Sequence, residues 1–125
     1  MDAKLCSGLD LAYIGDAYYE LIVRNHFINS GITKVNDLHK KVIKYTCAEH
    51  QSKVIKYFIK ENMLSQEEIS MFKRGRNSNT NKTRKTLSKE DYNNATGFES
   101  LIGYLYMSNM LDRALELILA SLAYE

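Results

Sequence analysis

The amino-acid sequence predicts an all-α protein that folds as one domain. The chain contains no proline, and its apolar residues recur with the 3.6-residue period of a helix rather than in the alternation typical of strands. At 125 residues, of which 45% are hydrophobic, it is long enough to bury one core and too short to bury two comfortably. We find no internal repeat, and therefore expect a single helical domain over residues 1–125.

The first half of the chain predicts two helical segments. The first carries apolar residues close to the helical repeat, namely Leu9, Ala12, Tyr13, Ala17, Leu21 and Phe27. We expect it to end near Gly31, because glycine suits the left-handed conformation that commonly follows a helix. The second segment is expected to start with Asn36 or Asp37 as its capping residue and to run to Ile59. That span is long, so we expect a break near Thr46.

A short helix followed by a loop is predicted next. Ser65 and Glu68 have the spacing of a capping box, in which each side chain binds the other residue's backbone N–H. The helix should continue through Phe72. Residues 75–87 are rich in Asn, Ser, Thr and basic side chains with almost nothing apolar to bury, which indicates a long exposed loop.

Two further helices complete the predicted domain. Ser88 resembles another helix start, because acidic residues follow it in the first turn. The segment from Ala95 to Tyr106 is strongly apolar, and a last helix extends from Leu111 to Leu122.

Basic residues are concentrated in one part of the chain. The seven in this segment are Lys73, Arg74, Arg76, Lys82, Arg84, Lys85 and Lys89, and no acid lies between Glu68 and Glu90. The net charge of the whole chain is only +2, so the remainder is mildly acidic. Such a segment favours a polyanionic partner bound at one place on the surface. A merely solvated loop is the alternative, and composition leaves both open.

The N-terminus and the cysteines indicate an intracellular protein. The segment from Met1 to Gly8 is short and contains Asp2 and Lys4, so it does not resemble a secretory signal or a membrane anchor. Two cysteines, Cys6 and Cys47, are too few for a disulfide framework or a four-ligand zinc site. We expect a cytoplasmic protein.

Asp16 is the first candidate for chemistry. It interrupts the apolar run Leu11–Ala17, and a buried carboxylate needs a cation or strong hydrogen bonds. Glu20 and Arg24 follow at intervals of one helical turn on the same face. The three side chains could therefore form a self-neutralising charge cluster, or Asp16 could bind a metal.

Glu99 is the second candidate. It is the only acid between Asp91 and Asp112, in the most hydrophobic predicted helix, and it is flanked by Gly97 and Gly103. Glycine is a poor helix former, so its presence here suggests close approach of another backbone. If this helix crosses the first one, Asp16 and Glu99 face each other, and two carboxylates in a dry site favour a divalent cation.

A structural alternative exists for Glu99. An arginine, Arg24 or Arg113, could pair with it and neutralise its charge. The sequence leaves both this ion pair and a metal site open.

Four segments carry a resemblance to a known family. Leu11–Ala17 resembles the Gly-Asp signature helix of the ribonuclease III family, and Phe98–Gly103 is similar to its second acidic motif. Asn36–Lys41 and Lys73–Asn77 narrow the resemblance to the Mini-III branch, which lacks the double-stranded-RNA-binding domain. The similarity covers nearly the whole chain, with the motifs in the family's order.

The resemblance implies one ribonuclease III-type catalytic domain, acting as a homodimer that cuts double-stranded RNA. It makes Asp16 and Glu99 catalytic residues and ligands of Mg²⁺, with Mn²⁺ as an alternative ion. Larger enzymes of the family carry further acids where this chain has Ala12 and Thr96, which leaves the number of metal ions open. The family's substrates point to precursor ribosomal RNA of the 23S type. A non-catalytic RNA-binding or ribosome-assembly protein on the same fold is the alternative.

RNA contacts are expected from two groups of residues. Phosphate contacts are expected from the basic segment, through Lys73, Arg74, Arg76, Lys82, Arg84 and Lys85. Asn77 could reach a hydroxyl or a base edge. The resemblance adds Thr33, His39 and Lys40. Three tyrosines of the first helix, Tyr13, Tyr18 and Tyr19, could line a dimer interface.

Overall fold

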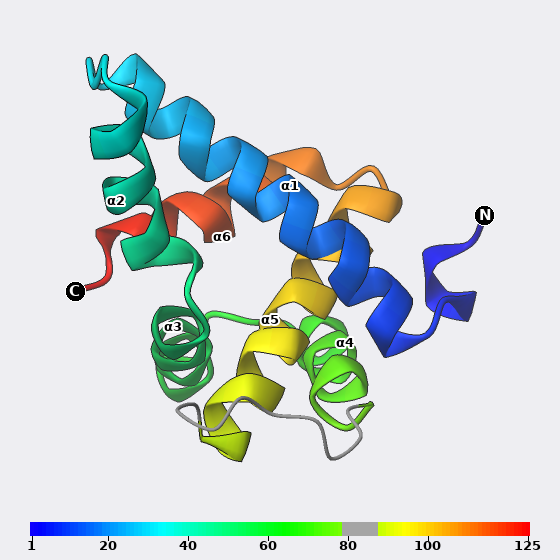
Figure 1. Ribbon diagram of the computed structural model, residues 1–125. Coiled ribbons are helices and arrows are strands. Elements are labelled where there is room, and N and C mark those ends of the chain that lie inside the picture. The colour runs from blue at the N-terminus through cyan, green and yellow to red at the C-terminus, as the bar shows by residue number, and fades with distance from the viewer. Residues whose placement is uncertain (79–87) are drawn as a thin grey trace.

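The protein is a bundle of helices, as the sequence predicts. The computed structural model describes residues 1–78 and 88–125, and these contain no strand. In chain order the elements are η1 (Ala3–Leu5), α1 (Gly8–Asn29), α2 (Val35–Thr46), α3 (Ala48–Lys60), α4 (Gln66–Arg76), α5 (Lys89–Met107) and α6 (Leu111–Ala123) (Figure 1). The predicted all-α fold is therefore confirmed.

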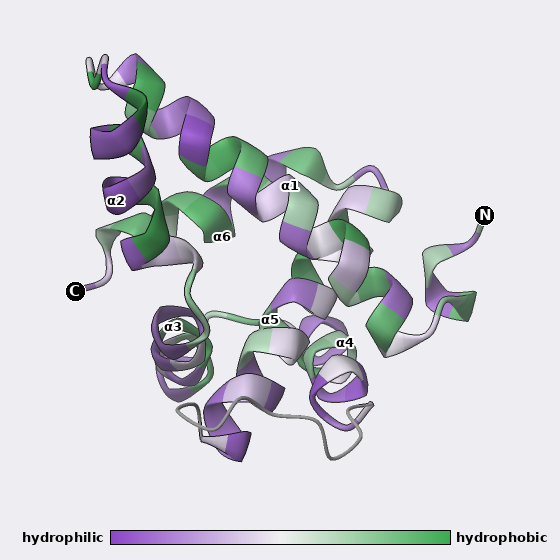
Figure 2. Ribbon diagram, viewed as in Figure 1, coloured by the Kyte–Doolittle hydropathy of each residue, from purple (hydrophilic) through white to green (hydrophobic). Residues whose placement is uncertain are grey.

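Helix α5 forms the centre of the bundle. Every residue from 94 to 105 is buried except Glu99, which is half-buried. A helix that is buried on all sides must be surrounded by others, and α5 packs against α1, α3 and α4. Figure 2 shows α3 with its hydrophilic residues on the side turned away from α5. The one acid within this buried stretch therefore stands out against apolar and small neighbours.

Helices α1 and α5 cross with their backbones in contact. A Cβ atom added at Gly15 would lie 1.8 Å from the carbonyl oxygen of Glu99, and one added at Gly103 would lie 1.9 Å from that of Leu11. Neither position can hold a larger side chain unless the helices separate. The close approach predicted from Gly103 is confirmed.

A second close approach joins α4 to α5. A Cβ atom at Gly97 would lie 2.6 Å from the carbonyl oxygen of Phe72, and one at Gly75 would lie 2.4 Å from the Cβ atom of Ser100. The sequence predicts that Gly75 opens the loop, but α4 continues through Arg76. The missing side chain explains this difference, because it lets the last turn of α4 pack directly on α5.

Most helix boundaries agree with the sequence. Gly31 has φ +101° just after α1, and the break predicted near Thr46 separates α2 from α3, with Cys47 in an extended conformation. Ser65 and Glu68 form the predicted capping box. The side chain of Ser88 caps α5.

The predicted start of α2 is wrong. The helix begins at Val35, and Lys34 occupies the capping position without a side-chain hydrogen bond. Asn36 and Asp37 lie inside the first turn instead. An acid there still favours the helix, because its charge complements the positive end of the helix dipole.

The apolar residues that predicted α1 are mostly not those that form its buried face. Leu9 is 47% exposed, Tyr13 84% and Leu21 60%. The buried face is formed by Leu11, Ala12, Gly15, Tyr19, Val23 and Phe27. Helix α1 is thus apolar on two sides, and the exposed side forms a stripe of residues four apart, which we call the α1 stripe: Leu9, Tyr13, Ala17 and Leu21.

Tyr19 has a structural role rather than the predicted role in an interface. Its side chain is fully buried, and its hydroxyl donates to the carbonyl oxygen of Tyr45 at 2.9 Å and also contacts the hydroxyl of Ser121. Burial raises the pKa of Tyr19 and keeps its hydroxyl neutral. Tyr18 is partly buried against Tyr106, with ring centroids 4.8 Å apart.

None of the helices in the described part of the chain combines the length and the apolar character that a membrane span requires.

Candidate active site

Asp16 and Glu99 come together where α1 crosses α5. Gly15, the residue before Asp16, touches the backbone of Glu99 itself, so the contact between the helices brings the two acids side by side. Burial, the charge of Asp16 and a hydrogen bond with Asp16 raise the pKa of Glu99 from 4.5 to about 9. Near neutral pH the pair therefore holds a proton that an arriving cation would replace.

Arg24 does not neutralise this pair. Its guanidinium forms an ion pair with Glu20, one helical turn away. The predicted cluster of Asp16, Glu20 and Arg24 is therefore reduced to its last two members. Asp16 is exposed and interacts with Glu99 instead.

Arg113 is also engaged elsewhere. Its Nε atom donates to Glu68 at 2.8 Å and its Nη2 atom donates to the carbonyl oxygen of Met63 at 2.7 Å. Glu116 forms a further ion pair with it. Both arginines considered as partners of Glu99 thus belong to other ion pairs, and the metal-site interpretation is favoured.

The two positions where larger relatives carry acids add no ligand here. Ala12 is buried, and the hydroxyl of Thr96 donates to the carbonyl oxygen of Tyr92 at 3.0 Å. Among residues 1–78 and 88–125, no three acidic, histidine or cysteine side chains gather at one point. The donor set is therefore two carboxylates. It suits Mg²⁺, which is commonly bound through one or two carboxylates and keeps several waters.

A hollow of about 200 Å³ adjoins Glu99. It is lined by residues of three segments: Thr46, Ala48 and Gln51 on one side, and Tyr92, Ala95, Thr96 and Glu99 on the other. Gln51 is a site residue that the sequence analysis missed. It precedes the buried residues Val54 and Ile55 by three and four positions, so a polar residue within the buried face of α3 was the available signal.

The predicted RNA-contacting residues near the end of α4 differ in exposure. Lys73 and Asn77 are exposed. The guanidinium of Arg76 lies 5.4 Å from the centre of the Phe72 ring and its Nε atom donates to Asn77 at 3.2 Å. Three other predicted contacts, Lys82, Arg84 and Lys85, lie outside the described residues.

Arg74 has a structural contact that the sequence did not predict. Its Nη1 atom donates to the carbonyl oxygen of Lys4 at 2.7 Å and to that of Cys6 at 3.0 Å. These bonds attach the N-terminal segment to α4. A role in RNA binding stays a prediction for this residue.

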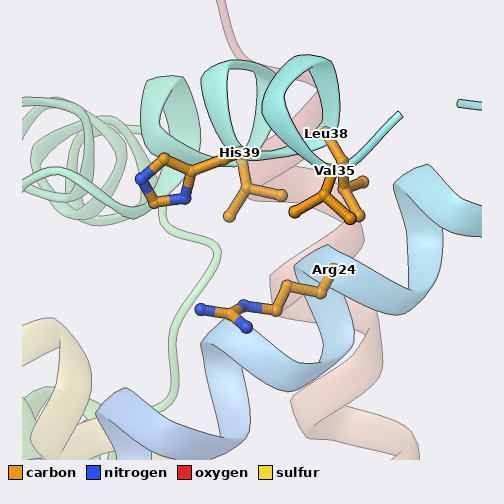
Figure 3. Close-up of a pocket in the computed structure, with 5 residues that line it drawn as sticks. Arg24, Val35, Leu38 and His39 are labelled. Carbon is orange, nitrogen blue, oxygen red and sulfur yellow. The ribbon is translucent and has the colours of Figure 1, made fainter. Parts of the chain in front are cut away.

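The other predicted RNA contacts lie at the far end of α1. Thr33, His39 and Lys40 are all exposed. His39 lines a small pocket of about 70 Å³ between α1 and α2, together with Val35, Leu38, Val42 and Arg24. Figure 3 shows Arg24 on α1 and His39 on α2, with the guanidinium group and the imidazole ring on the same side of the view. Arg24 of α1 thus lies beside His39 of α2.

Comparison with known proteins gives consistent matches. Residues 9–110 match the family model described as the ribonuclease III domain. The Mini-ribonuclease 3 of Clostridium tetani is 48% identical over 120 residues, which cover 94% of this chain and 77% of that protein. That of Streptococcus pneumoniae is 38% identical over 118 residues, covering 94% and 92%. A crystal structure of a Fusobacterium nucleatum protein superposes with a TM-score of 0.82 at 31% identity, covering 94% of this chain and 92% of that one.

Proposed function

Because the chain belongs to the ribonuclease III family, in its Mini-ribonuclease 3 branch, we propose that it is a magnesium-dependent enzyme that hydrolyses phosphodiester bonds of double-stranded RNA. Family membership makes it an endoribonuclease of the ribonuclease III type. We propose in addition that it requires Mg²⁺ and that it prefers double-stranded RNA. The requirement for an ion is supported by the coupled pair of Asp16 and Glu99, because Arg24 and Arg113 form ion pairs with other acids. The preference for a duplex is supported by the family alone.

Asp16 and Glu99 would bind the Mg²⁺ ion together. Asp16 is exposed at the surface that RNA would approach, and Glu99 lies half-buried beside it. A bound Mg²⁺ would acidify an attacking water and stabilise the charge that develops on the phosphate and the leaving oxygen. To hold it, Glu99 must give up the proton that its pKa of about 9 retains at neutral pH. Binding of the cation and release of that proton are therefore coupled.

Cleavage of a synthetic RNA duplex tests this function. The duplex should be cut with Mg²⁺, more slowly or not at all after removal of the ion with EDTA, and the corresponding single strand should be a poor substrate. Cleavage that persists in EDTA would contradict the proposed cofactor. Duplex binding without any cleavage would favour the non-catalytic RNA-binding protein.

We extend the proposal to precursor ribosomal RNA of the 23S type, processed in the cytoplasm. This substrate is supported by the family resemblance alone. A base-paired stem of such a precursor should be cut at defined positions, and an unrelated duplex of equal length should be cut less efficiently. Equal cleavage of both would contradict this substrate.

The proposed RNA contacts lie on both sides of the acid pair along α1. Gly8, at one end of the helix, touches the backbone of Arg74, and Arg24 lies at the pocket lined by His39. Asp16 is midway between them. At 1.5 Å per residue, each group lies about 12 Å along the helix axis from the acid. This arrangement supports phosphate contacts that flank the cut strand.

The basic segment after α4 is expected to supply affinity rather than chemistry. Replacing Arg84 and Lys85 together by alanine should weaken duplex binding and lower its log-log salt slope by about one for each phosphate that these side chains neutralise. Turnover at saturating RNA should change little. The measurement is duplex binding across a salt series, alongside single-turnover cleavage.

A charge-matched control comes from α3. Lys53 and Lys60 are exposed on the side of that helix turned away from the core, so replacing both by alanine removes the same charge. This control should alter the salt slope less. A collapsed cleavage rate with an unchanged slope in the Arg84 and Lys85 variant would show that these residues help to build the active site.

The proposed homodimer is supported by the α1 stripe. Large apolar side chains at the surface often mark an interface, and Tyr13 is 84% exposed on the same helix as Asp16. A twofold dimer would present one acid pair to each strand of a duplex. The protein should therefore sediment as a dimer at micromolar concentration.

Tyr13→Arg is expected to convert the dimer into monomers, because a twofold interface would bring two new positive charges close together. Analytical ultracentrifugation measures the change. Tyr57→Arg is the control: Tyr57 is 41% exposed on α3, and its replacement should leave the dimer intact. A Tyr13→Arg variant that remains dimeric would place the interface elsewhere.

A further inference from the structure

Gln51 has an unusual environment for a glutamine. Its side chain is only 1% exposed, and its Nε2 atom has no hydrogen-bond partner among the described residues. It lies on α3 between neighbours that belong to the core, such as Val54 and Ile55. A buried amide donor without a partner is unfavourable for folding, so an apolar residue of similar size would suit the core better.

The side chain of Gln51 lies beside the active site. It lines the same hollow as Glu99 and Thr96. Its amide is near enough to the Glu99 carboxyl to lower that group's pKa, against the larger effects of burial and of Asp16. The contact nevertheless lacks the geometry of a normal hydrogen bond, since Nε2 remains unpartnered. The donor and the acceptor are thus adjacent but not aligned.

We propose that Gln51 is a positioning residue of the active site: its amide donates to the Glu99 carboxylate and so holds it toward Asp16 for cation binding. The inference rests on the proposed function, because it assigns Gln51 to the same metal site. Groups that orient a ligating carboxylate through hydrogen bonds typically affect metal affinity about 10–100-fold. This role explains the unfavourable burial of the amide.

Ser100 provides a matched comparison. It follows Glu99 directly, is fully buried, and its hydroxyl oxygen also has no partner among the described residues. It does not line the hollow beside Glu99, and it packs toward Gly75 of α4 instead. A general effect of unpartnered polar groups would appear at both positions, whereas a role in the metal site concerns Gln51 alone.

The experiment measures Mn²⁺ binding by calorimetry at pH 8 without RNA, and the melting temperature in EDTA, for the full chain and its variants. Gln51→Met keeps the volume and removes the amide. It should weaken Mn²⁺ binding about 10–100-fold and leave the melting temperature in EDTA unchanged or raised. Ser100→Ala should bind Mn²⁺ like the wild type. Gln51→Asn, which keeps the amide but withdraws it by one methylene, should also lose affinity while folding normally.

Unchanged Mn²⁺ affinity in either Gln51 variant would overturn the inference, while the metal site itself would stand if the wild type binds and Asp16→Asn does not. A sharply lower melting temperature in EDTA together with unchanged affinity would identify Gln51 as a structural residue. Equal loss of affinity in Ser100→Ala would also overturn it, because the effect would then be general. If the wild type fails to bind Mn²⁺, both the inference and the proposed cofactor are overturned.

Discussion

Asp16→Asn is expected to abolish duplex cleavage while leaving the fold and the RNA affinity nearly intact. The substitution removes the charge of one of the two carboxylates that would hold the cation, and hardly changes the volume of an exposed side chain. Loss of metal-ion stabilisation worth several kcal/mol corresponds to a rate reduction of roughly 10³-fold or more. Single-turnover cleavage at saturating RNA measures the effect, and gel-shift binding in Ca²⁺ or EDTA checks the affinity.

The control removes an acid of the same helix. Asp10 is exposed in the first turn of α1, so Asp10→Asn changes the net charge equally, and Asp10 is not among the groups that shift the pKa of Glu99. It should cut RNA like the wild type. Retained activity in Asp16→Asn would remove this residue from the metal site, and a large fall in melting temperature with retained activity would restore the interpretation as a structural charge cluster.

Glu99→Gln, like Asp16→Asn, is expected to abolish cleavage. It should also remove the stabilisation of the protein by metal ions. Near neutral pH the Glu99 carboxyl is protonated in the ion-free protein, because its pKa is raised to about 9. An amide is close in shape and charge to a protonated carboxyl, so the melting temperature without metal should barely change. Metal-dependent stabilisation should disappear in this variant.

Local patterns predicted the helices because their ends depend on neighbours in sequence. Ser65 and Glu68 cap α4 through each other's backbone, and Gly31 ends α1 through its own conformation. The acid pair was also predictable. Asp16 and Glu99 each interrupt an apolar run next to a glycine or near one, and glycine in a helix interior indicates that two helices approach closely.

Periodicity could not identify the buried face of α1. The helix carries one apolar set that includes Tyr13 and Leu21 and another that includes Leu11 and Val23, and both fit the helical repeat. Only packing on α5 decides which set is buried. The sequence therefore predicted the helix correctly, but its apolar pattern did not show that Leu9, Tyr13 and Leu21 would be exposed.

Tertiary contacts also explain the residues whose roles were missed. Gln51 is near Glu99 only because α3 packs on α5. Arg74 has the side chain of a phosphate-binding residue, yet its guanidinium binds two carbonyl oxygens of the N-terminal segment. Residue type gives the chemistry that a group can perform, and the partner depends on the fold.

Gly15→Ala tests whether the helix crossing builds the acid pair. The added Cβ atom would lie 1.8 Å from the carbonyl oxygen of Glu99 and 2.7 Å from the backbone nitrogen of Gly103. Both are backbone atoms that cannot rotate away, so α1 and α5 must separate. We expect a destabilisation of about 3 kcal/mol, at the upper end of typical overpacking effects, and a melting temperature lower by roughly 10 °C for a domain of this size. Mn²⁺ affinity should fall as well, since Asp16 moves away from Glu99.

Gly31→Ala is the control for Gly15→Ala, because it replaces a glycine that lies outside the contact between α1 and α5. Gly31 has φ +101° with no atom within 4 Å of an added Cβ, so alanine there strains the backbone without a clash. The expected cost is about 1 kcal/mol, and Mn²⁺ affinity should be unchanged because the residue lies beyond the end of α1. Thermal unfolding and calorimetry with Mn²⁺ measure both variants. A Gly15→Ala protein that melts like the wild type would show that the two helices do not touch at this point, and the acid pair would then need another explanation.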